Sequence, residues 1–135
     1  MDIVAIVLAT LFQYVFGMLW YSRTLLGLLW ASYMEEDGVS EIGLKRFNPM
    51  RAKSHATALL TALAIAIVLQ SLVVALSINT LRPALIWSLG IWASMLALPT
   101  LTEYRYSKRS LVLWAIDQSY YVCAIAGTAL IIVLL

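Results

Sequence analysis

The sequence predicts an all-α fold: a four-helix transmembrane bundle with a short interfacial helix after the first span. Three observations predict it. Of the 135 residues, 63% are hydrophobic. Only 12% are charged, compared with about 25% in soluble domains. The apolar residues are gathered in four long runs with few charges inside them, each long enough for a membrane core that takes about 20 residues. The length allows a single integral membrane domain, 1–135.

The chain begins with a predicted span over residues 3–20, which ends at an interfacial Trp-Tyr pair. The next apolar stretch, residues 24–34, is too short to cross the membrane, so we expect a helix that lies in the interface. Three consecutive acids follow it, and they oppose the dipole at the C-terminus of a helix. The helix is therefore predicted to end near Met34, and a polar linker is predicted over residues 39–47.

The other three spans are predicted from hydropathy and from the positions of prolines. Asn48-Pro49 is typical of a helix start, because asparagine caps the first N–H groups and proline fits the first turn. This helix supplies the second span, residues 54–77. The third span, residues 83–103, contains Pro99, which removes a backbone hydrogen bond and predicts a kink. The fourth span, residues 110–135, follows a basic turn and is capped by its first residue, a serine.

The distribution of lysine and arginine predicts the orientation. Eight of the nine lie in the loop after the first span or in the turn between spans three and four, and only Arg82 lies on the opposite side. By the positive-inside rule, the long loops face the cytoplasm and both termini face outward, in the inner (cytoplasmic) membrane of a cell. The net charge of +2 does not indicate a nucleic-acid partner. The expected partners are the lipid bilayer and either further copies of the chain or other membrane subunits.

One acid, Asp117, lies inside the last apolar run. A carboxylate at the centre of a bilayer costs roughly 3 kcal/mol or more, so it marks a candidate site. At a rise of 1.5 Å per residue, Asp117 is about 10 Å below the cytoplasmic boundary. Each of the other spans has a polar residue at a similar depth, and we expect these to form one layer with Asp117: Gln13, Thr61 and Ser94. Three further polar residues are expected at the rim of this layer: His55, Tyr21 and Glu103.

The layer has two interpretations. It could be a small polar cavity that binds an ion, a proton or a small solute at Asp117, or Asp117 could be a structural hydrogen-bond hub that holds the helices in register. No cofactor and no metal site is expected, because His55 and Cys123 are the only histidine and thiol and are far apart in the sequence. A lipid-modifying enzyme would need a second catalytic group beside Asp117, and only His55 and Glu103 are candidates.

Both ends of the chain contain motifs of a known family. The segment Gly17-Met-Leu-Trp20-Tyr21-Ser22, followed by Leu25-Leu26-Gly27-Leu28-Leu29-Trp30, resembles the opening of the "domain of unknown function 1761" proteins, which are small bacterial and archaeal multi-span proteins. The last span has a similar pattern: Trp114, Ile116-Asp117, Tyr120 and Gly127. Arg23 stands where the family usually has proline. The resemblance implies a four-span layout but no activity, because the activity of the family is itself unassigned.

The sequence therefore favours a small homo-oligomeric, transport- or channel-like membrane protein with a polar intramembrane site at Asp117. The alternative is an accessory structural subunit that packs against a larger membrane complex. The change Asp117→Asn separates a transport or enzymatic role from a packing role. Asparagine keeps the hydrogen-bonding shape but not the charge, so a packing hub should tolerate it.

Overall fold

The structure is a computed structural model that describes residues 2–22, 24–36 and 52–135. Every regular element in this part of the chain is helical, so the predicted all-α fold is confirmed. The elements in chain order are α1 (Ile3–Trp20), α2 (Gly27–Glu36), α3 (Ala52–Ala75), α4 (Leu81–Ile91), the π-helical turn η1 (Trp92–Ala97), α5 (Leu98–Tyr106) and α6 (Leu111–Leu134).

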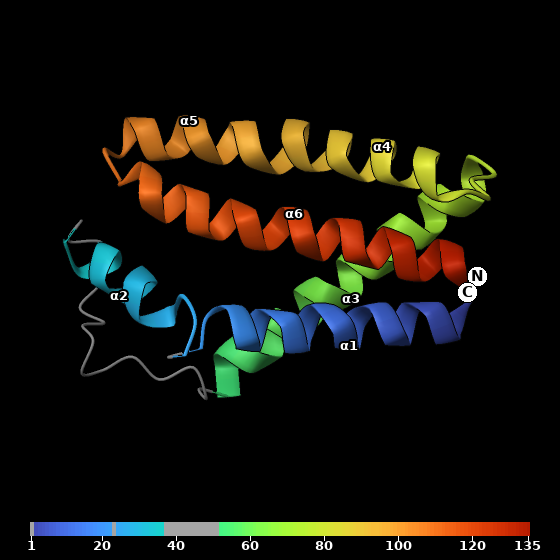
Figure 1. Cartoon of the computed structure of the whole chain (residues 1–135), viewed down its shortest axis with the longest axis horizontal. Helices are drawn as coiled ribbons and strands as arrows, with labels where there is room; N and C mark the ends of the chain where they lie inside the picture. The colour runs from blue at the N-terminus through green and yellow to red at the C-terminus, as the bar shows by residue number, and fades with distance from the viewer. Residues whose placement is uncertain (1, 23, 37–51) are drawn as a thin grey trace.

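Four segments are long and apolar enough to cross a membrane: Ile3–Trp20, His55–Ala75, Leu81–Tyr106 and Leu111–Leu134. The predicted first span matches its helix in both bounds. The third span is longer than predicted because α4, η1 and α5 form one continuous rod (Figure 1). Helix α2, which we predict to lie in the membrane interface, starts later than predicted because Thr24 to Leu26 form a turn, and it ends at Glu36 rather than near Met34. The predicted linker and the Asn48-Pro49 helix start lie outside the described residues.

Pro99 is accommodated without ending the rod. Its ring has no N–H to donate and crowds the carbonyl group four residues earlier. The turn before it widens into the π helix η1, which lies just N-terminal to Pro99, and such bulges are a common way to absorb a disturbed backbone ladder. The carbonyl of Ala97 then accepts a hydrogen bond from Trp114 Nε1 in α6 at 3.1 Å. The predicted disturbance at Pro99 is therefore a π turn.

Helix α6 is the centre of the bundle, because it contacts every other element. In Figure 1 it runs between α1 on one side and the α4–α5 rod on the other. Small residues permit this close packing: Ala124 and Thr128 are completely buried. At Gly127, a Cβ atom would come within 2.5 Å of the Phe12 ring of α1. Small residues let membrane helices approach closely where larger side chains would hold them apart.

Helices α1 and α3 cross with small residues at their contact. Ala66 packs against Ile6 and Ala9, and the Gln13 side chain donates a hydrogen bond to the carbonyl of Ala62 at 3.3 Å. The two chain termini lie close together at one end of the bundle (Figure 1). An even number of spans puts both termini on the same side of a membrane, so this arrangement fits a multi-pass protein with four spans.

Candidate functional site

The carboxyl group of Asp117 in α6 is bound by side chains from three other elements. The hydroxyl of Tyr21, at the end of α1, donates a hydrogen bond to Oδ1 at 2.5 Å. The hydroxyl of Tyr104, in α5, donates to Oδ2 at 3.0 Å. The Trp30 side chain, in α2, adds a further hydrogen bond. A charged group away from water is costly unless it is hydrogen-bonded, so these donors explain how the span accommodates an acid.

The turn between α1 and α2 places two of these donors. Its N–H group at Gly27 donates to the carbonyl of Ser22 at 2.9 Å. A Cβ atom on Gly27 would lie 2.7 Å from that carbonyl oxygen and closer still to the carbonyl oxygen of Tyr21. Only glycine allows the backbone to fold back this closely. As a result α2 lies beyond the end of α1 and contacts α6 (Figure 1), and Trp30 and Tyr21 both reach the carboxyl group.

Five aromatic side chains lie beside the carboxyl group or pack against those that do, and we call them the Asp117 aromatic cluster: Tyr21, Trp30, Tyr104, Tyr120 and Tyr121. The ring centroid of Tyr21 lies 5.9 Å from that of Trp30 and 5.6 Å from that of Tyr120, both in edge-to-face geometry. The centroids of Tyr120 and Tyr121 are 5.0 Å apart in a similar arrangement. Edge-to-face ring pairs are stabilised because the positive edge of one ring meets the negative face of the other. The cluster therefore holds the acid within packed, mainly apolar surroundings.

One cation lies beside the cluster. The guanidinium carbon of Arg109, in the turn before α6, is 5.2 Å from the centroid of the Tyr104 ring. This distance is within the range of cation–π attraction. The same guanidinium also attracts the carboxylate of Asp117. Arg109 therefore adds positive charge at the end of the cluster nearest the α5–α6 turn.

Tyr21 lies just beyond the first span and is mostly buried. Burial raises the pKa of its phenol far above the usual value, and the neighbouring carboxylate of Asp117 raises that pKa further. Both causes disfavour a second negative charge at this point. The phenol therefore stays neutral at physiological pH and keeps its proton for the hydrogen bond to Asp117.

The predicted polar layer is not assembled around Asp117. Gln13 is buried and donates to α3 instead. Thr61 is exposed on the outer face of α3. Ser94 is also exposed, and its hydroxyl donates to the carbonyl of Gly90 in its own helix at 2.7 Å. Depth along a helix axis fixes the level of a residue but not the side of the helix on which it lies, and the three side chains point in other directions.

Of the three predicted rim residues, the structure brings only Tyr21 to Asp117. The Nδ1 atom of His55 lies 2.5 Å from the hydroxyl of Tyr14, across the contact between α3 and α1. Its Nε2 atom is buried and has no hydrogen-bond partner among the residues that the structure describes. Glu103 is exposed on α5. His55 therefore connects α3 to α1 through Tyr14. Glu103 lies outside the Asp117 aromatic cluster.

A second polar network next to Asp117 was not anticipated from the sequence. Gln118 is only 4% exposed. Its Oε1 accepts a hydrogen bond from Trp92 Nε1 at 3.1 Å, and its Nε2 donates to the Thr100 hydroxyl at 3.1 Å. The same hydroxyl accepts from Trp114 Nε1 at 3.2 Å. Tyr104 was missed in the same way. The sequence did contain a signal for both: each is a polar side chain near the end of a span that adjoins the α5–α6 turn.

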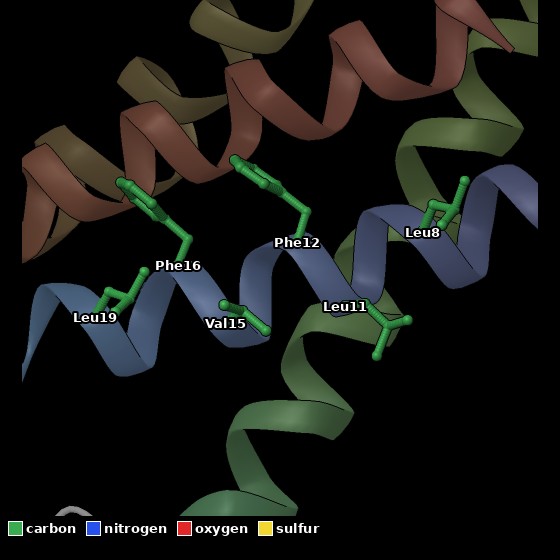
Figure 2. A pocket seen from close by; sticks show the side chains of 6 residues that line it. All are labelled: Leu8, Leu11, Phe12, Val15, Phe16 and Leu19. Atoms are coloured by element: carbon green, nitrogen blue, oxygen red, sulfur yellow. The ribbon is translucent and has the colours of Figure 1, made fainter.

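An apolar groove runs along the outer face of α1. Figure 2 shows the side chains that line it: Leu8, Leu11, Phe12, Val15, Phe16 and Leu19. The two phenylalanines point toward α6, and Phe16 stacks on Tyr120 with ring centroids 5.7 Å apart. Since no polar group lines it, the groove suits a hydrocarbon chain or an apolar helix surface rather than a polar solute.

Within the residues that the structure describes, no group of three or more His, Cys, Asp and Glu side chains could hold a metal ion. Cys123 is a free, exposed thiol on α6. The chemistry available at Asp117 is therefore that of a single carboxylate with phenol and indole donors. Such a group can bind a proton or a cation and can exchange hydrogen bonds with the helices around it.

Comparison with known proteins identifies a family. The family model described as "Protein of unknown function (DUF1761)" matches residues 4–133, nearly the whole chain. This confirms the resemblance of the two chain ends and extends it through the middle. No match is found among the curated proteins or among the solved structures. The function must therefore be inferred from the geometry of the site.

Proposed function

Since the chain belongs to the DUF1761 family of proteins of unknown function, we propose its function from its own geometry: it is a small homo-oligomeric, transport- or channel-like membrane protein that binds a proton or a cation at Asp117. One observation carries this proposal. The carboxyl group lies inside a span, yet its hydrogen bonds come from α1, α2 and α5. An ionisable group inside a span is a functional candidate by default, and here its partners are known.

The hydrogen bonds provide a way to couple binding to movement. A proton or cation on the carboxylate takes up oxygen lone pairs that now accept from Tyr21 and Tyr104. The occupied and empty states therefore favour different positions of the α1–α2 turn and of α5. A ligand shifts a conformational equilibrium only by its difference in affinity for the two states. Asp117 is placed to supply such a difference.

A transport pathway would have to lie between several copies of the chain. The other three spans pack around α6 and the aromatic rings of the Asp117 aromatic cluster pack on one another, while the groove on α1 has only hydrocarbon walls (Figure 2). Neither feature supplies a polar route through one copy. A symmetric assembly of copies would bring several Asp117 sites to a shared boundary, as closed homo-oligomers commonly do.

We further propose that the Asp117 end faces the cytoplasm of a prokaryotic cell, across the inner membrane, with both termini outside. The basic turn before α6 lies at this end, and Arg109 is among the cluster's neighbours. The opposite end of the bundle has Arg82 and both termini. This asymmetry of lysine and arginine supports the orientation.

The second candidate is an accessory subunit of a larger membrane complex. The observation that favours it is the exposed apolar face of α1, where Leu11 and Val15 are each 49% exposed. Such a face fits a partner helix as well as it fits lipid. In this role Asp117 would be a hydrogen-bond hub, and its charge would not matter.

Flux in liposomes of purified protein tests the proposal. We would load the vesicles with a pH-sensitive dye to follow proton entry, or with a sodium-sensitive dye to follow sodium entry, and impose a potassium diffusion potential. The wild type, Asp117→Asn and Ser94→Ala would be compared in both assays. Ser94 is exposed and bonds only to its own helix in the described structure, so its variant is the control. We expect Asp117→Asn, but not Ser94→Ala, to reduce either the proton flux or the sodium flux by at least about tenfold, because asparagine removes the charge and keeps the shape of the side chain.

Native mass spectrometry of the gently extracted complex accompanies the flux assay. A closed homo-oligomer supports the pathway between copies. Equal flux in Asp117→Asn and the wild type would contradict the transport role. Extraction together with other polypeptides in a fixed ratio would favour the accessory subunit.

A further inference from the structure

We propose that the cation taken at Asp117 is a weakly hydrated organic monocation of the guanidinium or alkylammonium class, an inference that rests on the proposed function and names its ligand. The site joins one carboxylate to five aromatic side chains, the Asp117 aromatic cluster. Aromatic faces carry negative potential and attract cations that can be stripped of water. A site with one carboxylate and several aromatic rings is therefore suited to a cation that has one positive charge and an apolar surface.

The composition of the cluster argues against a divalent metal ion. Calcium and magnesium take six or more oxygen ligands, usually with several carboxylates. In the described part of the chain, Asp117 has no second carboxylate, histidine or thiol with which to form a group of three ligands. The phenol oxygens nearest to it direct their protons at the carboxylate. Beside the acid, the site therefore offers the face of the Tyr104 ring, over which Arg109 lies, rather than a cage of oxygen ligands.

The chain already places a cation of this class at the site. The Arg109 guanidinium lies over the face of Tyr104, 5.2 Å from its centroid, and attracts Asp117. A guanidinium is planar, delocalised and more weakly hydrated than an ammonium group. The Arg109 guanidinium therefore acts as an intramolecular ligand at the edge of the Asp117 aromatic cluster. A free cation with the same chemistry should compete with it for the Tyr104 ring and the carboxylate.

The backbone makes exchange of this intramolecular ligand feasible. Arg109 lies in the short turn between α5 and α6, where its N–H donates to the carbonyl of Tyr104 at 2.9 Å. The turn holds the start of the side chain, but the residue as a whole is only partly buried. The guanidinium can swing toward the headgroups while the backbone stays in place, because long basic side chains reach the interface readily. An arriving cation would then take its place.

Equilibrium dialysis of the purified full chain in detergent against radiolabelled methylguanidinium tests the proposal. We expect saturable binding with one site per chain. Asp117→Asn should weaken binding by at least about tenfold, and Tyr104→Leu by about fivefold, because the aromatic face is lost. Tyr104→Phe keeps the face and should stay within about threefold of the wild type. Arg109→Gln should strengthen binding by about threefold or more, since the internal competitor is gone.

Tyr106→Leu is the matched control: the same substitution on the same helix, at a side chain that is 86% exposed. It should leave binding unchanged. Thermal melting of each variant shows whether it is folded, and if Asp117→Asn is not, the pair Tyr104→Leu and Arg109→Gln still decides the question. Equal binding by Tyr104→Leu and Tyr106→Leu, or weaker binding by Arg109→Gln, would overturn the proposal.

The outcome is separable from that of the flux assay. Absence of saturable methylguanidinium binding by the wild type overturns the organic-cation inference. If proton or sodium flux still depends on Asp117, the proposed function stands with a different ligand. If that flux is also independent of Asp117, both proposals fail.

Discussion

The turn between α1 and α2 allows a sharp test of how the Asp117 site is built. The perturbation is Gly27→Ala. The added methyl group would lie 2.7 Å from the carbonyl oxygen of Ser22, whereas ordinary C···O contacts are about 3.3–3.6 Å. The backbone must therefore open by about 0.6 Å or more at Ser22, and further at Tyr21, whose carbonyl oxygen would be nearer still to the methyl group. Because the obstacle is backbone rather than the end of a flexible side chain, no rotamer change can relieve it.

The cost follows from two contributions. Forcing an extra methyl group into a filled site costs about 1–3 kcal/mol. Opening the turn also lengthens the 2.9 Å hydrogen bond from Gly27 N–H to the carbonyl of Ser22, and a hydrogen bond of this kind contributes about 1 kcal/mol. We expect Gly27→Ala to lower the free energy of unfolding by about 2–4 kcal/mol.

Gly90→Ala is the matched control. It is also a helical glycine, but a Cβ atom there meets nothing within 4 Å. Alanine in place of glycine in a helix interior should stabilise by about 0.5–1 kcal/mol. The two variants carry the same change in composition, so the predicted difference of about 2.5–5 kcal/mol between their free energies of unfolding reports the local geometry.

Unfolding by sodium dodecyl sulfate in mixed micelles, followed by far-UV circular dichroism, measures both variants. Tryptophan emission reports the site in parallel, because Trp30 should leave the Asp117 aromatic cluster when the turn opens. If Gly27→Ala is as stable as Gly90→Ala and has an unchanged emission spectrum, the close approach at Gly27 does not position the cluster.

Two further predictions follow from the same contacts. Gln118→Leu should lower the free energy of unfolding by about 1–3 kcal/mol, because it leaves the Trp92 indole N–H without its acceptor and removes the hydrogen bond from Gln118 to the Thr100 hydroxyl; an unfolding titration equal to that of the wild type would contradict this. Thr61→Ala and Ser94→Ala should each stay within about 0.5 kcal/mol of the wild type, as is usual for surface substitutions, and a larger loss in either would show that it contacts a neighbouring copy or subunit.

The spans could be predicted because hydropathy and length act along the chain and need no tertiary information. A long run of apolar residues must either cross the membrane or be buried in the protein, and the ends of the run mark the ends of the helix. The bounds of α1 were therefore predicted to the residue. The cap of α6 was equally local: the hydroxyl of Ser110 accepts from Val112 N–H at 3.2 Å. Pro99 also signalled a disturbance, but whether it produces a kink or the π turn η1 depends on packing against α6, where Trp114 takes up the carbonyl of Ala97.

The surroundings of Asp117 could be predicted only in part. The acid itself and Tyr21 were recognised, because a charge inside a span and a tyrosine at its end are visible in the sequence. Gln13, Thr61 and Ser94 were grouped with them by depth, but a helix turns about 100° per residue, so depth says nothing about the direction of a side chain. Tyr104 and Trp30 were not linked to the acid, since only the hairpin of α5 and α6 and the turn at Gly27 bring them to it.

The sequence by itself therefore determined the membrane class, the four spans and the presence of one acid that needs partners. Those properties follow from composition and one-dimensional order, through the cost of placing polar groups in hydrocarbon. Only the tertiary structure decided which partners the acid has. That choice depends on helix rotation and on two tight turns, in which single atoms such as the absent Cβ of Gly27 set which side chains can meet.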